Sequence, residues 1–308
     1  MRKFDLFRLA SSLMLGCIVT FYSISSLAAC RSDGVDLQIL GSGGPFGAGK
    51  RASSGYLVWI DGVARVMVDA GGGTFLRFHE AEAAVETLDI LAISHLHPDH
   101  SSEIPALFWA QGASTPIAGP SGTDSLPSIS EFMISMFQSE QAAFRVLGTL
   151  RESDIMEIDA SGRSPTIVLE NDDYVLRGIG VPHGTTPTIG YRIDVGNRSI
   201  AFASDQTGTN EEFTRLIQGV DILIAHFAAS ESAEGVPAGL HAKPSVWARM
   251  AQEANVSQLV LSHLSYTVEN HDRYDDLTGS DLNGNIDIVR ETYSGPITIA
   301  SDLMCIPL

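Results

Sequence analysis

Residues 95–100 read His-Leu-His-Pro-Asp-His and directly follow the apolar run of residues 88–94, which predicts a buried strand. The cluster therefore lies where a rigid strand ends, so its side chains are held in place before a metal arrives. Imidazole and carboxylate are ligands that zinc and similar first-row metals accept. A lone histidine is usually a hydrogen-bonded core residue or a surface residue, whereas four donors within six positions predict a metal site. The four candidate ligands are His95, His97, Asp99 and His100.

Apolar runs of strand length recur along the chain, and helical stretches alternate with some of them. This arrangement indicates an α/β layered fold. The nearly continuous apolar runs at residues 221–226 and 257–262 indicate sheets covered on both faces. The chain has 308 residues, enough for a large core, and no linker is evident, so we predict one domain over residues 31–308. We expect strands at residues 35–40, 55–60, 64–68, 90–93, 166–169, 174–179, 189–195, 199–203, 222–225, 258–261 and 297–300, and helices at residues 102–111, 128–140, 210–219, 243–254 and 287–293.

The first 29 residues form a separate segment. Arg2, Lys3 and Arg8 precede an apolar stretch at residues 9–27, and small residues follow at positions 28 and 29. This order is typical of a secretory signal peptide. A transmembrane anchor is the alternative, but five serines make the stretch a poor permanent span. We therefore predict a signal peptide at residues 1–29 and an exported protein, either periplasmic or a lipoprotein of the cell envelope.

The cysteines leave two alternatives open. Cys17 lies in the signal peptide, so the mature chain keeps Cys30 and Cys305. Residues 27–30, Leu-Ala-Ala-Cys, resemble the lipobox of bacterial lipoproteins, in which the cysteine becomes the lipidated first residue. An oxidising compartment would equally permit a disulfide between Cys30 and Cys305. Lipidation would make Cys30 a lipid anchor and leave Cys305 a free thiol.

The charge of the chain argues against one class of partner. Its formal net charge is -18, and a strongly acidic surface repels phosphate backbones. Residues 151–300 contain no block of lysines and arginines that would form a nucleic-acid stripe. We therefore predict a small-molecule substrate and no nucleic-acid partner. The sequence leaves a homodimer open.

Three further donors occur elsewhere in the chain, each at the end of a predicted apolar strand. They are His183, Asp205 and His263. Singly each is weak evidence, because an aspartate after a strand is often a turn residue or a helix cap. A zinc pair needs donors beyond the first cluster. The common strand-end context of the three therefore predicts that they join it.

These motifs resemble, in order and over nearly the whole mature chain, those of the metallo-β-lactamase-fold superfamily of dinuclear metal hydrolases. Asp69, in Val-Asp-Ala-Gly-Gly, is similar to the first motif, and residues 95–100 are similar to the second. His183, Asp205 and His263 are similar to the third, fourth and fifth. The resemblance implies a four-layer αβ/βα sandwich with two metals at one edge, between the two sheets.

The resemblance also implies how the ligands divide between the metals. The first metal takes His95, His97 and His183; the second takes Asp99, His100 and His263; Asp205 bridges, and Asp69 orients the ligand loop. We expect two Zn²⁺ ions, with another first-row divalent metal as the alternative. Two cations about 3.5–4 Å apart need a negative bridge, and they lower the pKa of water enough to create a hydroxide nucleophile.

Within the superfamily, the chain resembles the tRNase Z and arylsulfatase-like group. Dizinc β-lactamases usually present cysteine at the fourth motif, where this chain has Asp205. Residues 41–45 and 183–192 are similar to the opening loop and the third motif of the group. His241 lies close to the position of the group's catalytic histidine, where it would protonate a leaving group or bind an oxyanion. A surface loop histidine is the alternative reading of His241.

The chain departs from the tRNA-processing members at one tract. Those members usually have an acidic residue after the histidine that corresponds to His226, and this chain has Phe227. The missing carboxylate, the export signal and the acidic surface argue against tRNA maturation. His226 is either close to the metal ligands or substrate, or a structural histidine at a strand end.

We therefore predict an exported dinuclear zinc hydrolase that uses a metal-bridging hydroxide on a small ester, and we favour a phosphodiester or an aryl sulfate ester. The candidate catalytic residues are Asp69, Asp99 and His241. The alternatives are a single-iron oxidoreductase of the sulfur dioxygenase type on the same fold, a lactone or β-lactam hydrolase, and a non-catalytic metal-binding protein. The complete second ligand set argues against a single iron.

Overall fold

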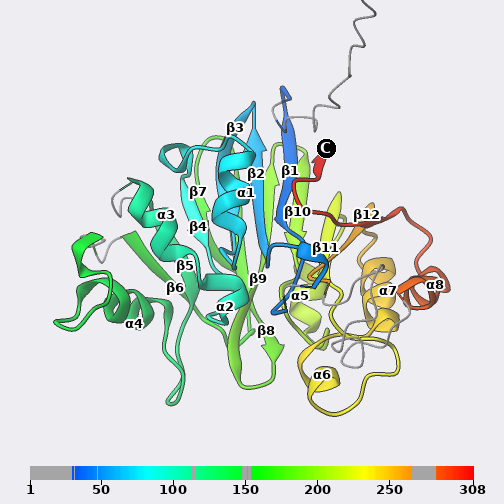
Figure 1. The fold of residues 1–308 in the computed structure, drawn as a ribbon. Coiled ribbons are helices and arrows are strands. Elements are labelled where there is room, and N and C mark those ends of the chain that lie inside the picture. Colours follow the sequence, from blue (N-terminus) through cyan, green and yellow to red (C-terminus); the bar gives the residue numbers. More distant parts are fainter. Residues whose placement is uncertain are drawn as a thin grey trace, which may run out of the picture.

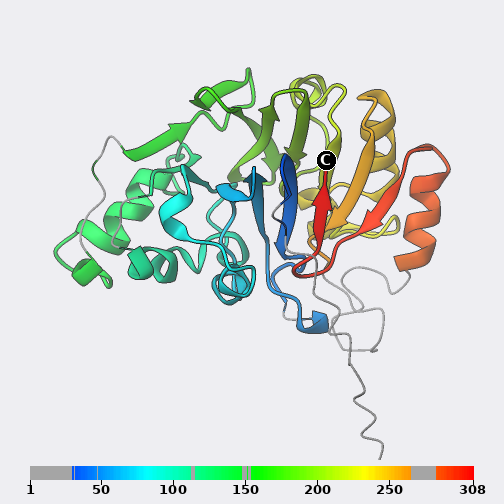
Figure 2. The same ribbon diagram turned by 90° about the horizontal axis from the view of Figure 1, so that it is seen from above.

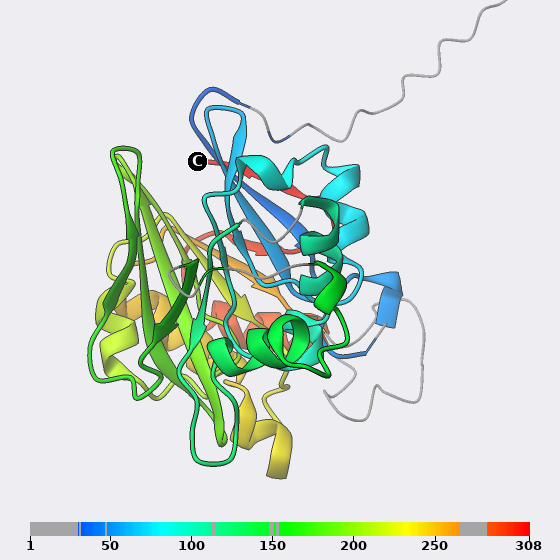
Figure 3. The same cartoon turned by 90° about the vertical axis from the view of Figure 1, so that its left-hand side faces the viewer.

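The computed structural model describes residues 30, 32–46, 48–111, 115–147, 151, 154–264 and 282–308. Within these ranges two seven-stranded mixed sheets face one another, and helices cover their outer faces (Figures 1, 2 and 3). The predicted four-layer αβ/βα sandwich is therefore confirmed. The predicted signal peptide at residues 1–29 lies outside the described residues. No helix in the described part of the chain is long and apolar enough to span a bilayer.

The two sheets repeat one pattern of strand pairing. In each sheet the three strand pairs at one side are antiparallel and the three at the other side are parallel. The first sheet has the spatial order β14 (Cys305–Pro307), β1 (Val35–Gly41), β2 (Gly55–Ile60), β3 (Val63–Val68), β4 (Ile90–Ala92), β5 (Ile117–Pro120) and β6 (Ile155–Ile158). The second has the order β13 (Ile297–Ile299), β12 (Gln258–Ser262), β11 (Ile222–His226), β10 (Arg198–Phe202), β9 (Thr186–Val195), β8 (Val175–His183) and β7 (Thr166–Glu170).

Helices form the two outer layers (Figure 1). Those on the first sheet are α1 (Thr74–Glu80), α2 (Pro98–Ser101), α3 (Ile104–Gln111) and α4 (Ile129–Met133), which continues as a π-helical turn, η3 (Ile134–Gln138). The later ones are α5 (Glu211–Leu216), α6 (Gly235–Leu240), α7 (Pro244–Glu253) and α8 (Leu282–Arg290). Short 3₁₀ turns occur at η1 (Ala48–Lys50), η2 (Val85–Thr87) and η4 (Arg145–Leu147).

The core is divided by the sheets into three apolar layers. Along β2, Tyr56 and Val58 point into the layer between the sheets, whereas Leu57 and Trp59 point toward the helices of the first sheet. Residues alternate between the two faces of a strand, so a strand buried on both faces is apolar throughout. A third layer packs α5, α7 and α8 against the second sheet. This burial explains why the central strands could be identified as continuous apolar runs.

Every strand expected from the sequence occurs in the structure, although its ends differ by up to four residues. Three short strands, β5, β6 and β14, were not expected. The predicted helix at residues 128–140 turns π-helical at residue 134. The helix expected at residues 287–293 begins earlier, at Leu282, because Leu282, Ile286 and Val289 lie on one face that packs into the third apolar layer.

The fold joins the ends of the described chain. Cys30 forms a disulfide with Cys305 at the start of β14, with the Cα atoms 5.4 Å apart. Strand β14 pairs in turn with β1. Of the two alternatives that the sequence left open, the structure contains the disulfide.

Candidate metal centre

The candidate ligands lie at one edge of the sandwich because they follow the carboxyl ends of strands. Parallel strands bring their carboxyl ends to the same edge of a sheet, where ligand sites of α/β proteins form. His183 is the last residue of β8, Asp205 follows β10, and His263 follows β12. The histidine-rich cluster follows β4 in the facing sheet. The two sheets therefore present their donors toward each other.

The first group of donors is formed by His95, His97 and His183. One ligand atom of each lies within 4.8 Å of the others. Nε2 of His95 is 2.9 Å from Nδ1 of His97. The rings meet edge to face, with centroids 4.5 Å apart for His95 and His97 and 5.2 Å apart for His97 and His183. Three imidazole nitrogens thus converge on one point.

The second group is formed by Asp99, His100 and His263. Oδ2 of Asp99 is 3.5 Å from Nε2 of His100 and 3.2 Å from Nε2 of His263. The rings of His100 and His263 are stacked with centroids 5.2 Å apart. All three side chains are buried.

Asp205 lies between the two groups. Its Oδ2 is 3.9 Å from Nε2 of His95 and 3.7 Å from Nε2 of His183 in the first group. The same oxygen is 3.6 Å from Nε2 of His100, and Oδ1 is 3.4 Å from Nε2 of His263, in the second. The structure therefore brings together all seven predicted ligands, and it places Asp205 where a bridging carboxylate has to be.

The donor set fits bound divalent cations. Ligand nitrogens around a tetrahedral zinc ion lie about 3.3 Å apart, because each Zn–N bond is about 2.0–2.1 Å. The observed separations of 2.9–3.9 Å bracket that spacing. In addition, Nε2 of His100 and Nε2 of His183 are buried and have no hydrogen-bond partner among the described residues. An unpartnered buried nitrogen is costly in free energy unless a ligand satisfies it.

Outer hydrogen bonds aim the ligand nitrogens at the centre. Nδ1 of His100 donates to Oδ2 of Asp69 at 2.8 Å, and Nδ1 of His183 donates to the carbonyl of Leu240 at 2.9 Å. Asp69 also accepts from the backbone N–H of Ser94 at 2.7 Å and from its hydroxyl at 2.9 Å. Such partners fix the tautomer and the orientation of a metal-binding histidine. Asp69 therefore lies where the resemblance predicted an orienting residue, outside the ligand set.

The backbone at the centre is held in an unusual conformation. Asp69, Ser204 and His263 have φ values of +61°, +58° and +55°, which lie in the left-handed region. A residue other than glycine adopts this region at a cost of order 1–3 kcal/mol, and such residues cluster at functional sites. Each of the three follows directly on a strand or lies one residue beyond it, and Ser204 directly precedes the donor Asp205.

Burial and opposite charges shift the pKa values of the centre strongly. Burial lowers the pKa of His100, but Asp69, Asp99 and Asp205 together raise it well above its ordinary value. Burial raises the pKa of Asp205, but His263, His241 and His100 together lower it well below its ordinary value. Burial likewise raises the pKa of Asp99, and His100 and His263 lower it to about 2. The carboxylates of the metal-free centre are therefore ionised at neutral pH and paired with a protonated imidazole.

His241 faces the centre. Its side chain is only 16% exposed, and its Nδ1 lies 3.8 Å from Oδ1 of Asp205. Its ring centroid is 5.2 Å from that of His183. Burial lowers the pKa of His241 to about 4; Asp205 opposes this shift, and the histidines around it add to it. The reading of His241 as a surface loop histidine is therefore wrong.

His226 contacts the bridging carboxylate. Its Nδ1 lies 2.7 Å from Oδ1 of Asp205, and its Nε2 lies 3.1 Å from the hydroxyl of Tyr56, which donates to Ser262. His226 is thus the neighbour that orients Asp205. Phe227 is fully buried among the helices of the second sheet and brings no carboxylate to the centre.

Three positioning groups were not found from the sequence. Ser94 directly precedes the histidine cluster, but a lone serine carries no signal. The carbonyl of Leu240 and the hydroxyl of Tyr56 reach the centre only through the packing of distant elements. Gly44 was likewise not identified from the sequence as a close neighbour of His263. A Cβ at residue 44 would lie 2.7 Å from Cε1 of His263.

Comparison with known families agrees with this geometry. The model of the family described as "Beta-lactamase superfamily domain" matches residues 64–264. The chain belongs to this superfamily. The match spans the five motifs from Asp69 to His263, and membership of the metallo-β-lactamase-fold superfamily is thus confirmed.

Curated relatives and solved structures are similar to the chain over most of its length. A ribonuclease Z of Methanosarcina mazei is 25% identical over 86% of this chain and 95% of that protein. An uncharacterized protein of Mycobacterium tuberculosis is 28% identical over 75% of this chain and 81% of that protein. The metallo-β-lactamase-fold protein YhfI of Bacillus subtilis has a TM-score of 0.66 at 22% identity, covering 89% of this chain and 99% of its own. The short form of human tRNase Z has a TM-score of 0.65 at 20% identity, covering 88% and 98%.

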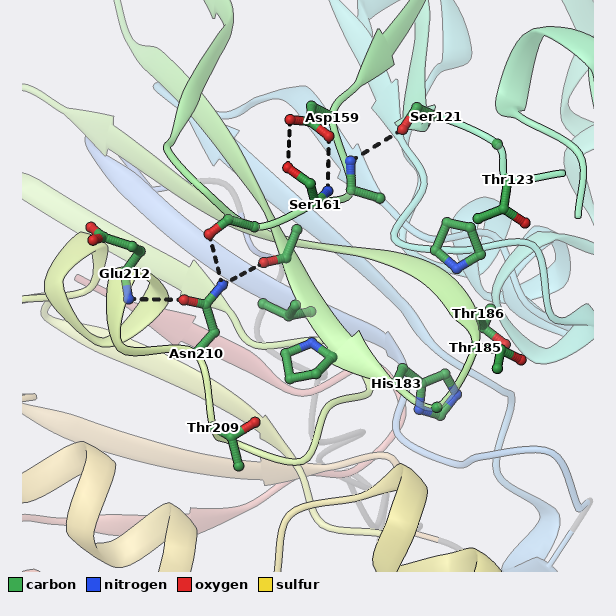
Figure 4. Close-up of a pocket in the computed structure, with 18 of the residues that line it drawn as sticks. Ser121, Thr123, Asp159, Ser161, His183, Thr185, Thr186, Thr209, Asn210 and Glu212 are labelled. Carbon is green, nitrogen blue, oxygen red and sulfur yellow. Dashed lines mark hydrogen bonds between the residues drawn. The ribbon is translucent and has the colours of Figure 1, made fainter.

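In this member of the superfamily, a polar hollow of about 700 Å³ adjoins His183. Figure 4 shows His183, Thr185 and Thr186 at one end of it. Farther along, the amide of Asn210 donates to the carbonyls of Gly162 and Gly180. Hydroxyls and backbone groups thus line one approach to the centre.

Proposed function

We propose that this chain is an exported dinuclear zinc hydrolase that cleaves a small phosphodiester. The observation that carries the proposal is the position of Asp205, whose carboxylate lies 3.4–3.9 Å from histidines of both donor groups. A carboxylate shared by two donor groups is the arrangement required by a pair of cations. Curated relatives named ribonuclease Z support a phosphodiester as the bond that is broken, because a ribonuclease cleaves phosphodiesters.

The residues of the chain divide the work at the centre. Two bound cations would lower the pKa of water and neutralise charge on the substrate phosphate. His100 and His183 are held by Asp69 and the Leu240 carbonyl, so the nitrogens facing the centre are fixed before substrate arrives. Asp99 remains ionised because its pKa is about 2.

We assign His241 to stabilising negative charge on the substrate by a hydrogen bond. Its pKa of about 4 keeps the imidazole neutral at pH 7, so its N–H donates a hydrogen bond without a proton being lost. The acidic residue that follows the histidine corresponding to His226 in tRNA-processing members is Phe227 here. Bound cations would lower the pKa of His241 further.

The size and charge of the molecule favour a small substrate. The net charge of -18 repels a polyanion. Arg215, a cation lining the polar hollow, is already paired with Glu211 and Glu212. A short diester places one phosphate at the centre and needs no further cationic surface.

The experiment combines metal analysis with a substrate panel. We expect two zinc equivalents per chain, and turnover of a chromogenic phosphodiester above that of a phosphomonoester, sulfate ester, lactone or β-lactam. Asp205→Ala should abolish turnover, whereas Asp172→Ala, at an exposed turn, should leave it unchanged. Full activity without metal would refute the proposal. A single iron would favour the oxidoreductase, and preferred cleavage of the sulfate ester would favour an arylsulfatase.

Export is part of the same proposal. The signal-like residues 1–29 and the disulfide between Cys30 and Cys305 support it, because disulfides persist in oxidising compartments. The intact mass of the mature protein should rise by two hydrogens on reduction. A mass increased by acyl chains would instead indicate lipidation of Cys30.

A further inference from the structure

An apolar hollow of about 700 Å³ lies beside the metal-binding loop, between α2, α3 and η3. Among the described residues, its apolar walls include Phe75, Leu96, Trp109, Phe132, Met136 and Phe144. Trp109 is 68% exposed at its rim. Ligand pockets of proteins have volumes of about 300–1,000 Å³ and mostly apolar walls. The hollow is therefore large enough for a chain or ring of a small molecule.

The hollow adjoins the loop that carries the predicted ligands His95 and His97. Leu96 separates the ligands His95 and His97 in sequence, and Leu96 and Phe132 also line a smaller hollow of about 200 Å³. The wall of this smaller hollow includes His97 and Thr186. Nδ1 of His97 faces His95, and its Nε2 faces Thr186, so this imidazole lies between the other predicted ligands and the smaller hollow.

The chemistry of the walls limits the occupant to an uncharged group. Glu103 is the sole charged residue among the described ones lining the large hollow. Its two carboxylate oxygens accept hydrogen bonds from the backbone N–H groups of Gly73 and Phe75 at the start of α1. The hydroxyl of Ser101 is likewise engaged, with the carbonyls of Leu96 and His97. The described walls therefore offer no cation to a phosphate or carboxylate, in contrast to the metal centre.

We propose that this hollow binds the alkyl chain of an amphiphilic phosphodiester whose phosphate lies at the metal centre. The inference rests on the proposed function and narrows its substrate class. Burial of one methylene stabilises a complex by about 0.8 kcal/mol, which is about fourfold in affinity. If the alkyl chain of the substrate enters the hollow, kcat/KM should therefore rise steeply with the length of the alkyl chain until the hollow is full.

The test uses p-nitrophenyl alkyl phosphates with methyl, butyl and octyl chains, so that the leaving group stays the same. For the zinc-loaded wild type we expect kcat/KM to rise at least about tenfold from methyl to octyl. Ala106→Trp, which fills the hollow, should reduce this ratio to about one. Ile167→Trp, at an exposed position outside both hollows, is the matched control and should keep the ratio of the wild type.

A binding measurement keeps the test independent of turnover. The neutral fluorophore N-phenyl-1-naphthylamine should bind the wild type, be displaced by the octyl diester, and bind Ala106→Trp at least about tenfold more weakly. If Ala106→Trp does not fold, Trp109→Ala takes its place. This variant alters only the rim of the hollow, and it should bind the fluorophore more weakly than the wild type does.

The outcomes separate this inference from the proposed function. Cleavage of all three esters at one rate refutes the inference and leaves the proposed function standing. Absence of cleavage refutes the proposed function, and displacement of the fluorophore by the octyl diester then still supports the site. Light scattering tests a further outcome. If the wild type is a dimer and Ala106→Trp is a monomer, while the octyl-to-methyl ratio of kcat/KM stays the same, the hollow binds a second copy of the chain. That result would overturn the inference.

Discussion

Replacing Gly44 by alanine should weaken one metal position and spare the other. A Cβ at residue 44 would lie 2.7 Å from Cε1 of His263, 3.0 Å from its Nδ1 and 3.3 Å from its Nε2. Carbon atoms in ordinary contact are about 3.5–4.0 Å apart. The imidazole or the loop must therefore move by about 0.8 Å, which exceeds the tolerance of about 0.5 Å for a functional site.

Neither partner can move freely. His263 is fully buried, its ring stacks on that of His226 with centroids 4.7 Å apart, and its Nε2 lies 3.2 Å from Asp99. The loop is held because Ser42 binds Asp302 through both its backbone N–H and its hydroxyl, and its carbonyl accepts from Leu264. The loop and the imidazole of His263 therefore both have to move, and the imidazole nitrogen belongs to the second donor group.

We expect the zinc Kd of the second position to rise about 10–100-fold, which corresponds to about 1.4–2.8 kcal/mol, and that of the first to change less than about twofold. The assay is a two-site titration of the metal-free protein against a chromogenic zinc chelator. Gly239→Ala is the control, because a Cβ there has no heavy atom within 4 Å. Equal weakening of both positions, or of neither, would refute the reasoning from the contact with His263.

Further predictions concern the proton balance, the bridge and the disulfide. Zinc uptake at pH 7 should release protons, because the raised pKa of His100 keeps this histidine protonated in the metal-free centre. Calorimetry in buffers of different ionisation enthalpy should show this proton release. The number of protons released should decrease as the pH rises through the pKa of His100. His226→Asn should lower zinc affinity about 10–100-fold by freeing Asp205, and an unchanged chelator titration would contradict that role. Cys305→Ser should lower the free energy of unfolding by about 2–5 kcal/mol in urea titrations of the oxidised protein, and equal midpoints for variant and wild type would count against the bridge with Cys30.

The sequence was most informative where one residue pattern had one physical cause. Central strands such as β2 and β11 are buried on both faces, so they appear as continuous apolar runs. The strands that were not expected are short, and β6 and β14 form edges of the first sheet. Edge strands lack one neighbour and need no continuous apolar pattern. Helix α8 was placed too late because its first turn contains asparagine and glycine, which favour turns unless packing overrides them.

The donors themselves were determined by the sequence alone. Histidine and aspartate at the ends of apolar strands cannot satisfy their polar atoms in a core, so their residue types and positions already indicated a metal centre. Their order along the chain also indicated the superfamily, which the match over residues 64–264 then established.

Only the tertiary structure decided which groups surround those donors. Tyr56, the carbonyl of Leu240 and the Cα of Gly44 come from elements far apart in sequence, and nothing local marks them. The same is true of the proximity of Cys30 to Cys305, and of the small hollow lined by His97. The physical reason is that ligand chemistry is a property of single residues, whereas orientation, exclusion of water and the shape of a hollow arise from contacts between distant segments, which exist only after the two sheets have packed.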